Sequence, residues 1–282
     1  MATFHLRYPG GLNKALTFSY DDGVEQDIRL VEIFNKNGLK GTFNINTGSF
    51  AEEGTVYKPG VVHRRMTKQQ TYDLFANSPH EVAVHTLNHP FLEQLPTNMV
   101  VHEVLNDRKN IEEMFGKVTR GMAYPFGTTS DAVVEALRMC GILYSRTTKA
   151  TNSLELQKED WLRLSATCHH KSPMLNELGD KLINEQPARA PWLMYVWGHS
   201  YEFEGDNNWE IIENFCEKVG NRDDIWYATN IEIYEYITAY YSLVFSATGD
   251  TVYNPTATEL FFYDSRAKKC YSVKSGETKK LF

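Results

Sequence analysis

Short apolar runs alternate with amphipathic segments along most of the chain. The run from Ala15 to Tyr20 is apolar and β-prone, and no breaker precedes Gly23, which predicts a short buried strand. The segment from Asp27 to Asn37 then repeats apolar residues at helical spacing and ends before Gly38. A buried strand followed by an amphipathic helix is therefore the first structural unit that the sequence predicts.

The same unit recurs down the chain. The further expected strands are 39–45, 81–84, 119–124, 142–145, 192–197 and 225–229. The further expected helices are 67–77, 97–115, 130–140, 175–184, 208–219 and 231–241. Residues from about 146 to 173 show no regular period and are expected to be irregular. About seven strand–helix repeats predict an α/β fold whose parallel sheet is closed, or nearly closed, into a barrel.

The rhythm changes after residue 241. Turn-forming pairs such as Gly249-Asp250 and Ser275-Gly276 separate short β-like runs there. We expect residues 242–282 to form a small antiparallel β appendage that packs on a barrel built by residues 1–241. No paired His or Asp residues occur in this tail, so it is expected to carry no catalytic group.

Charge and composition exclude several classes of partner. The 282-residue chain has a net charge of −7 and no basic block, which argues against nucleic acid. No apolar run is long enough for a membrane span. The start of the chain lacks the features of a signal peptide, and its four cysteines form no CxxC pair. A reduced, cytoplasmic protein is the expectation, and a trimmed exported protein is the alternative; the sequence predicts no oligomeric state.

Reactive residues follow the predicted strands. Asp21 and Asp22 end the first strand, where adjacent residues point to opposite sides and can do different work. His85 and His89 follow the third strand, and histidines four apart on a helical turn can reach one ion. Together with one carboxylate they would form a His₂Asp site with open positions, as in catalytic metal centres. The alternatives are an Asp-Gly turn and a pair of surface or capping histidines.

Two other strand ends carry candidate chemistry. Tyr124 lies in MAYPFG at the end of the fourth strand, and His199 lies in WGH at the end of the sixth. In a parallel barrel the C-terminal strand ends form one face, where active sites are found. The sequence therefore predicts that these residues and the Asp and His pairs meet on one face.

The motifs SYDDG, HTLNH, AYPFG and WGH, in this order and spacing, resemble those of polysaccharide deacetylases of carbohydrate esterase family 4, the NodB homology group. The resemblance covers roughly residues 15–241. It implies a distorted (β/α) barrel of about seven strands. It also implies a metal-dependent hydrolase that removes acetyl groups from an acetylated amino sugar, oligosaccharide or polysaccharide.

Carried over residue by residue, the resemblance also implies roles. Asp21 resembles the catalytic base and His199 the catalytic histidine, while the Tyr124 N–H would help to form the oxyanion hole. One divalent ion is implied, with Zn²⁺ the first choice and Co²⁺, Ni²⁺ or Mn²⁺ as alternatives. The implied metal ligands are Asp22, His85 and His89. The expected substrate contacts are Pro125, Phe126, Trp197 and Tyr201, with core packing as the alternative for the tryptophan.

One departure from the family pattern concerns the base. An arginine that pairs with the base usually begins the third motif, and Ala123 stands at that position. Arg120 lies three residues earlier, so strand alternation points it to the opposite face. Arg163 is the candidate replacement, and a surface arginine is the alternative interpretation.

The region around the fourth family motif also departs from the family pattern. Asp160 and Trp161 resemble that motif only loosely. His169 and His170 fall in the segment expected to be irregular, where exposed loop histidines are the expectation and a place at the cleft border is the alternative.

Two other functions fit the same fold. The first is hydrolysis of a small cyclic amide without a metal, which the missing arginine favours and the intact ligand set Asp22, His85 and His89 opposes. The second is a non-catalytic carbohydrate-binding protein. Retention of Asp21 and His199, which binding alone does not need, opposes that alternative.

Overall fold

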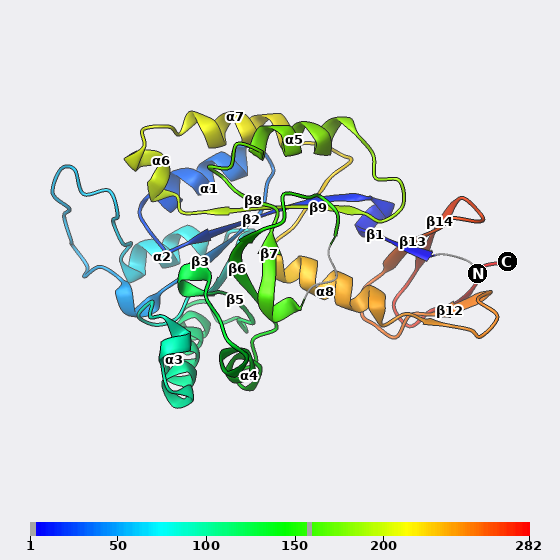
Figure 1. Cartoon of the computed structure of the whole chain (residues 1–282), viewed down its shortest axis with the longest axis horizontal. Coiled ribbons are helices and arrows are strands. Elements are labelled where there is room, and N and C mark those ends of the chain that lie inside the picture. The colour runs from blue at the N-terminus through cyan, green and yellow to red at the C-terminus, as the bar shows by residue number, and fades with distance from the viewer. Residues whose placement is uncertain (1–3, 157–159) are drawn as a thin grey trace.

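The computed structural model describes residues 4–156 and 160–282. Its main sheet has nine strands in the order β7-β6-β5-β4-β3-β2-β9-β8, with β10 paired to β2 (Figure 1). The strands are β2 (Lys14–Asp21), β3 (Gly41–Ile45), β4 (Glu81–Val84), β5 (Gly121–Ala123), β6 (Tyr144–Ala150), β7 (Leu164–Ala166), β8 (Cys168–His169), β9 (Trp192–Gly198) and β10 (Trp226–Tyr227).

The sheet closes on itself through one continuous segment. Only Thr167 separates β7 from β8, and β7 pairs with β6 while β8 pairs with β9, both in parallel. Counted as one strand, β7 and β8 complete a ring of seven parallel strands. The predicted α/β fold, a distorted barrel of about seven strands, is therefore confirmed.

The closing segment is one that the sequence pattern missed. Residues 164–169 fall within the region expected to be irregular, because LSATCH has too few apolar residues for a recognisable strand. Conversely, the expected seventh strand at 225–229 contributes only the two-residue β10, which pairs beside the start of β2 rather than closing the ring.

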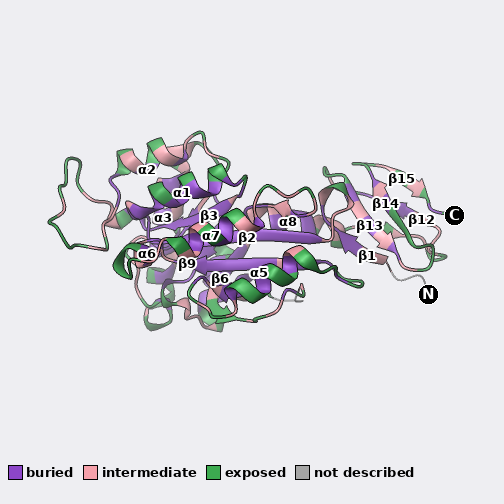
Figure 2. Cartoon of the chain, turned by 90° about the horizontal axis from the view of Figure 1, so that it is seen from above, coloured by how far each residue is buried: buried purple, intermediate pink, exposed green. Residues whose placement is uncertain are grey.

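Over residues 4–156 and 160–282, eight α-helices surround the barrel, and Figure 2 shows buried strands enclosed by helices that are exposed on their outer sides. They are α1 (Gln26–Lys36), α2 (Lys68–Phe75), α3 (Thr97–Phe115), α4 (Asp131–Met139), α5 (Leu175–Asn184), α6 (Tyr201–Gly205), α7 (Glu210–Val219) and α8 (Asn230–Tyr241). Short 3₁₀ turns occur at Pro9–Gly11, Thr47–Ser49, Leu92–Gln94, Pro125–Gly127 and Trp161–Arg163. None of the helices within the described ranges is long and apolar enough to cross a membrane.

Two small antiparallel sheets lie beyond the barrel. One contains β1 (Phe4–Arg7), β13 (Leu260–Asp264) and β14 (Lys269–Val273), and the other contains β11 (Val244–Phe245), β12 (Thr251–Tyr253) and β15 (Thr278–Lys280). The expected C-terminal β structure is present, and the N-terminal strand joins it. The division of the chain at residues 241 and 242 stays a prediction.

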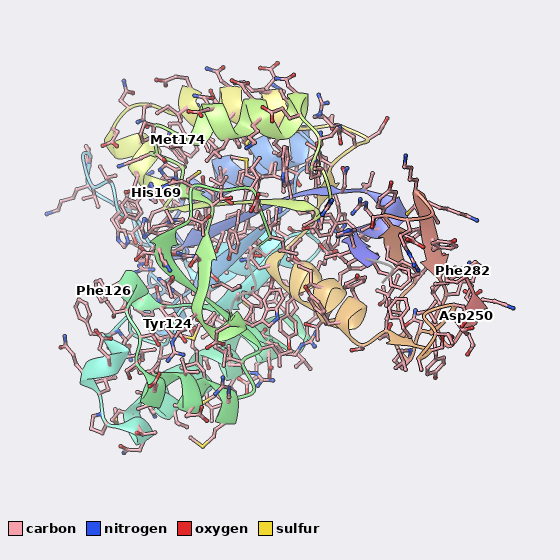
Figure 3. The ribbon with its side chains drawn as sticks, turned by 45° about the vertical axis from the view of Figure 1, so that its right-hand side comes forward. Tyr124, Phe126, His169, Met174, Asp250 and Phe282 are labelled. Carbon is pink, nitrogen blue, oxygen red and sulfur yellow. The ribbon has the colours of Figure 1, made fainter. Side chains whose placement is uncertain are left out.

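The appendage lies far from the expected active-site face. Figure 3 shows Asp250 and Phe282 at one end of the molecule and Tyr124, Phe126 and His169 toward the other. A buried apolar cluster that includes Val252 and Phe262 holds the two small sheets together. The appendage is thus built by apolar packing and turns, away from the strand ends that carry the candidate chemistry.

Candidate active site

Asp21 is the last residue of β2 and is almost fully buried. Its Oδ1 accepts a hydrogen bond from Asn44 Nδ2 at 2.8 Å, and its Oδ2 accepts one from the buried guanidinium of Arg146. Burial alone would raise the pKa of Asp21, but Arg146, with His85 and His199 nearby, holds it below its usual value. The Asp21 carboxylate is therefore ionised at neutral pH.

Arg146 supplies the guanidinium that is missing at Ala123. The two residues are direct partners across the β5–β6 ladder, so the arginine comes from the neighbouring strand. Its guanidinium also lies 4.5 Å from the ring centre of Trp197. The prediction that Arg163 replaces this arginine is wrong, because Arg163 pairs with Asp131 and Asp160 instead.

Asp22 leaves the strand in a left-handed conformation, with φ of 89°. Its Oδ1 lies 3.2 Å from Arg65 Nη2, and its Oδ2 lies 3.3 Å from His63 Nε2. Burial would raise the pKa of Asp22, but the His63 contact and the charges of His85 and Arg65 hold it well below its usual value. The two adjacent carboxylates thus have separate partners, as expected, but the left-handed backbone at Asp22 rather than strand alternation accounts for it.

His85 and His89 face the Asp22 carboxylate. Their Nε2 atoms each lie 3.9 Å from Asp22 Oδ1, and the candidate ligand atoms of all three residues lie within 4.8 Å of one another. His85 Nδ1 lies 2.8 Å from the Ala123 carbonyl oxygen, which can only accept, so Nδ1 carries the proton and Nε2 keeps its lone pair.

The protonation states of these residues suit a metal ion. Burial lowers the pKa of His85, and burial together with His85 lowers the pKa of His89 to about 4. Both imidazoles are therefore neutral near pH 7, as metal ligands must be. Two neutral imidazoles and one carboxylate fit a divalent ion with positions left open, and the Ala123 carbonyl fixes one imidazole from behind.

The histidine loop is not a helical turn, contrary to the sequence expectation. β4 ends at Val84, and both Thr86 and His89 adopt positive φ, at 67° and 58°. Two polar groups on α3 hold this shape: Glu103 binds the Asn88 N–H at 2.8 Å, and Asp107 binds the His85 N–H at 3.0 Å. Tertiary hydrogen bonds to a helix, rather than local helical geometry, bring the two imidazoles together.

Unusual backbone conformations gather around this site. Among the described residues, eight non-glycine residues have positive φ, and four of them, Asp22, Thr86, His89 and Phe126, lie at or beside the Asp22–His85–His89 cluster. Such conformations persist only where surrounding contacts enforce them, and they concentrate at functional sites.

His199 lies between two acidic groups. Its Nε2 is 4.0 Å from Asp21 Oδ2, and its Nδ1 is 3.5 Å from Glu202 Oε2, which is an ion-pair contact rather than a well-aligned hydrogen bond. Burial would lower the pKa of His199, but Glu202 and Asp21 outweigh it and raise the pKa above its usual value. The imidazole is thus the group in this site that favours carrying a proton.

Sequence reasoning missed Glu202, which begins α6 together with Tyr201. The same Oε2 atom lies 3.2 Å from both His169 Nε2 and His170 Nε2. His170 is almost fully buried, so the exposed-loop expectation is wrong for it, because it directly follows β8 and its ring packs against Tyr20 and Phe203. His169 Nδ1 accepts the Lys171 N–H at 3.1 Å, so its Nε2 carries the proton that faces Glu202. His169, His170 and Glu202 form a second group whose candidate ligand atoms lie within 4.8 Å of one another.

The expected role of Tyr124 needs correction. Its backbone N–H donates to the Arg146 carbonyl oxygen at 2.9 Å, because the β5–β6 ladder continues one residue past Ala123. An N–H that is used in the sheet cannot also stabilise an oxyanion. The Tyr124 side chain is buried and donates to the Leu162 carbonyl. Pro125 has no N–H, so the next backbone donor along the chain is that of Phe126.

The expected substrate contacts divide into exposed and buried groups. Phe126 is 48% exposed, stacks on Phe91 and places its ring 4.5 Å from that of His89. The Tyr201 ring lies between His63 and His199, at 4.7 Å and 5.3 Å. Pro125 is buried, and Trp197 is only 9% exposed beneath Arg146. Phe126 and Tyr201 can therefore reach a bound molecule more readily than the other two.

The polysaccharide deacetylase family model matches residues 9–145. The curated peptidoglycan-N-acetylglucosamine deacetylase PgdA of Listeria monocytogenes is 23% identical over 151 residues, which cover 53% of this chain. The match spans 27% of that relative, about a quarter of its length.

Two solved structures share the fold. A presumed polysaccharide deacetylase from Mycobacterium smegmatis aligns over 86% of this chain and 96% of its own, with 16% identity and a TM-score of 0.59. The chitin deacetylase of the fungus Colletotrichum lindemuthianum aligns over 78% of this chain and 88% of its own, with 16% identity and a TM-score of 0.52. The family match includes the Asp21–Asp22 strand end, the histidine loop and β5, so the comparisons support a relationship of this chain to polysaccharide deacetylases.

Proposed function

We propose that this protein is a metal-dependent hydrolase that removes acetyl groups from an acetylated amino sugar in an oligosaccharide or polysaccharide. The observation that carries the proposal is the arrangement of Asp22, His85 and His89 beside two groups of opposite protonation preference. Asp21 has a lowered pKa and His199 a raised one, which suits a base and an acid in one site. The named activity of the Listeria relative on N-acetylglucosamine supports the choice of substrate class.

The three ligands would hold one divalent ion, with zinc as our first choice and cobalt, nickel or manganese as alternatives for a His₂Asp set. When bound, such an ion polarises a carbonyl oxygen and lowers the pKa of a coordinated water. Arg65 and His63 orient the Asp22 carboxylate toward the imidazoles. The Ala123 carbonyl does the same for His85 through its Nδ1–H.

The remaining residues move protons and stabilise charge. Asp21 accepts the proton of the attacking water, and Arg146 and Asn44 keep its carboxylate ionised and fixed. His199 gives its proton to the departing amine, which leaves poorly without one. The Phe126 N–H, in place of that of Tyr124, donates to the developing oxyanion, a contact of the kind whose loss costs about 10²–10³ in rate.

Metal content and acetate release test this proposal together. Purified protein is analysed for bound metal near neutral pH without chelator, and then assayed on acetylated chito-oligosaccharides and on acetylxylan. We expect about one divalent ion per chain and acetate release that a chelator abolishes and zinc restores. Acetate release that persists without any metal would contradict the metal-dependent mechanism. Bound metal without acetate release from any acetylated glycan would contradict the substrate class.

His85→Ala provides the matched variant. Removal of one of three protein ligands should lower metal occupancy and activity together, because the remaining ligands are loosened as well. His102→Ala on the outer face of α3 is the control, since its ring contacts only Asn106 of the same helix among the described residues. Loss of activity in His85→Ala with full metal occupancy would remove this residue from the ligand set.

A further inference from the structure

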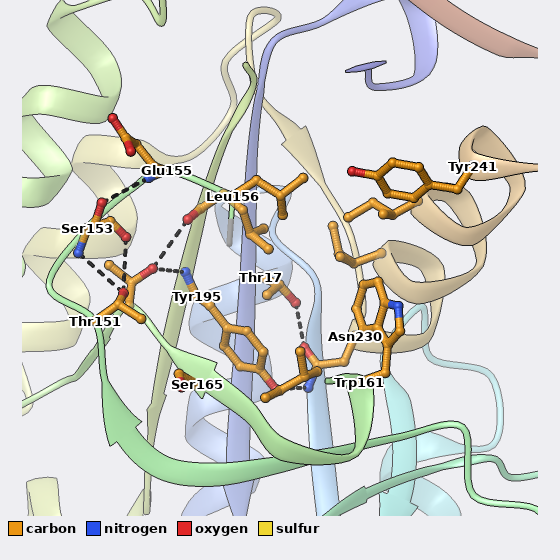
Figure 4. Close-up of a pocket in the computed structure, with 15 residues that line it drawn as sticks. Thr17, Thr151, Ser153, Glu155, Leu156, Trp161, Ser165, Tyr195, Asn230 and Tyr241 are labelled. Atoms are coloured by element: carbon orange, nitrogen blue, oxygen red, sulfur yellow. Dashed lines mark hydrogen bonds between the residues drawn. The ribbon is translucent and has the colours of Figure 1, made fainter. Parts of the chain in front are cut away.

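A cavity of about 280 Å³ opens at the barrel wall (Figure 4). It lies between β7, β9, one side of α8 along its length and the segment 151–156. Thr17 lines the cavity and precedes Asp21 by four residues on β2, so the two residues lie about 13 Å apart along the strand. The cavity is therefore separate from the metal-binding face.

Polar groups form the floor of the cavity. Asn230, the first residue of α8, accepts a hydrogen bond from Thr17 Oγ1 at 2.8 Å through its Oδ1. Its Nδ2 donates to the Tyr195 hydroxyl at 2.6 Å. Figure 4 shows these three side chains joined at one end of the cavity.

Asn230 has capacity for another partner. Its side chain is 3% exposed, and a carboxamide offers two N–H donors and two acceptor positions. Within the described part of the chain, its side-chain contacts use one N–H and one acceptor position. One donor and one acceptor position therefore remain on a buried side chain that lines the cavity.

Apolar side chains form most of the walls. They are contributed by Leu156, Trp161, Leu164, Leu193, Ile233 and Ile237. Among the described residues that line the cavity, Glu155 is the one ionisable acid or base other than tyrosine. Apolar walls above a neutral polar floor select against ions and strongly polar sugars, because their lost hydration would not be replaced.

We propose that this cavity is a second binding site, for a neutral and mainly apolar small molecule that carries one hydroxyl or amide group at its leading end. Such a group can both donate to and accept from the free positions of Asn230. The volume is close to the lower limit of small-molecule sites, roughly 300–1,000 Å³, so one or two rings would fill it.

A pair of matched probes tests the site with the full-length chain. p-Cresol carries a ring and one hydroxyl, and toluene has the same shape without the hydroxyl. Both are titrated into the protein and followed by NMR, and neither measurement depends on deacetylase activity. We expect saturable millimolar binding of p-cresol, and binding of toluene that is weaker by roughly threefold to tenfold, the effect of one neutral hydrogen bond. Absence of saturable binding, or equal affinity for the two probes, would overturn the proposal.

Variants locate the bound probe. Leu193→Trp places a larger side chain into the cavity from β9, and should weaken p-cresol binding at least tenfold. Met139→Trp, at a 71% exposed position on α4, is the control and should bind as the unaltered protein does. If Leu193→Trp does not fold, Leu164→Trp fills the cavity from β7. Unchanged binding in a folded filled variant, or equal loss in the control, would place the probe elsewhere and refute this site.

Discussion

Asp21 and Glu81 are both carboxylates of the barrel strands, yet they lie at opposite strand ends and differ in charge. Asp21 ends β2 and has a lowered pKa, because Arg146 pairs with it and histidines surround it. Glu81 begins β4, and burial raises its pKa to about 7. Its partners are neutral: Thr42 and the Ile231 N–H at 2.9 Å, and the Tyr144 hydroxyl at 2.8 Å.

The difference shows how one barrel separates two kinds of buried acid. Neutral hydrogen bonds offset part of the desolvation of Glu81, whereas the buried cation Arg146 keeps Asp21 ionised against it. Arg146 and four of the positive-φ residues lie at the end that carries Asp21. The buried cation at the opposite end, Lys14, pairs with Asp224 and leaves Glu81 with neutral partners. For these two acids, the end that carries Asp21 is the charged end and the end that carries Glu81 is the neutral end.

The largest expected effect separates the two adjacent acids of the charged end. Asp21→Asn keeps the size of the side chain but cannot accept a proton, so turnover should fall by about 10²–10⁴ while bound metal is retained. Asp22→Asn removes a negative ligand, so metal affinity should fall as well, and excess zinc should restore part of its activity. Elemental analysis beside acetate-release assays distinguishes the variants. Equal loss of metal in both, or rescue of Asp21→Asn by zinc, would reverse the assignment.

Replacement of the buried cation Arg146 should destabilise the folded protein. Arg146→Met leaves Asp21 buried without its partner, which should lower the free energy of unfolding by about 3–5 kcal/mol. The double variant with Asp21→Asn should recover part of that loss, since no uncompensated charge then remains. Arg163→Met, which breaks only partly exposed ion pairs, should change stability by about 1 kcal/mol or less. Urea unfolding measures all three, and similar losses for Arg146→Met and Arg163→Met would contradict the pairing.

The position of Arg146 also shows what could not be predicted from the sequence. The strand pattern predicted the barrel, and the C-terminal strand ends predicted that Asp21, Asp22, His85 and His199 would meet, because parallel strands present these ends on one face. The pairing of Arg146 with Ala123 depends on register between two strands, and no local pattern encodes that register.

The other missed or corrected features have the same origin. Glu202 acts on His199 through an ion pair that depends on where α6 places the carboxylate relative to residues from another strand end. Tyr124 is excluded as an oxyanion donor because the ladder to β6 extends one residue further than its motif suggests. His170 is buried because it directly follows β8, a weakly apolar strand that helps to close the barrel. Each of these features depends on how neighbouring elements are arranged and not on the local sequence of one segment.

Replacement of Glu202 should have a smaller effect, on the pH dependence of activity. Glu202→Gln removes a negative charge beside His199 and should lower the pKa of its imidazole. A group that acts as an acid loses activity as pH rises through its pKa. The alkaline limb of the pH profile of kcat/KM should therefore move to lower pH, with a loss of roughly tenfold at neutral pH.

A second carboxylate variant controls for general effects of charge. Glu204→Gln removes an acid of the same short helix that pairs with Arg64 and Gln26 rather than with His199. It should leave the alkaline limb in place. If Glu202→Gln lowers activity without moving that limb, Glu202 supports the fold of the site and does not tune its acid.

The last expected effect concerns the pH dependence of stability and Glu81 at the neutral end. Its pKa is raised from 4.5 to about 7, so the folded protein keeps a proton that the unfolded chain releases. Stability from this group is therefore present below pH 4.5 and is lost as pH rises to about 7, by at most about 1.4 kcal/mol per pH unit, with no further change above. Glu81→Gln cannot ionise, so the difference in unfolding free energy between variant and parent should shift in favour of the variant across this window.

Glu113→Gln on the exposed face of α3 is the control, and the difference in unfolding free energy between it and the parent should not change with pH. Urea unfolding at several pH values from 4.5 to 8 makes the comparison. A constant difference for Glu81→Gln would mean that Glu81 titrates alike in both states and that the two barrel ends do not differ in this way.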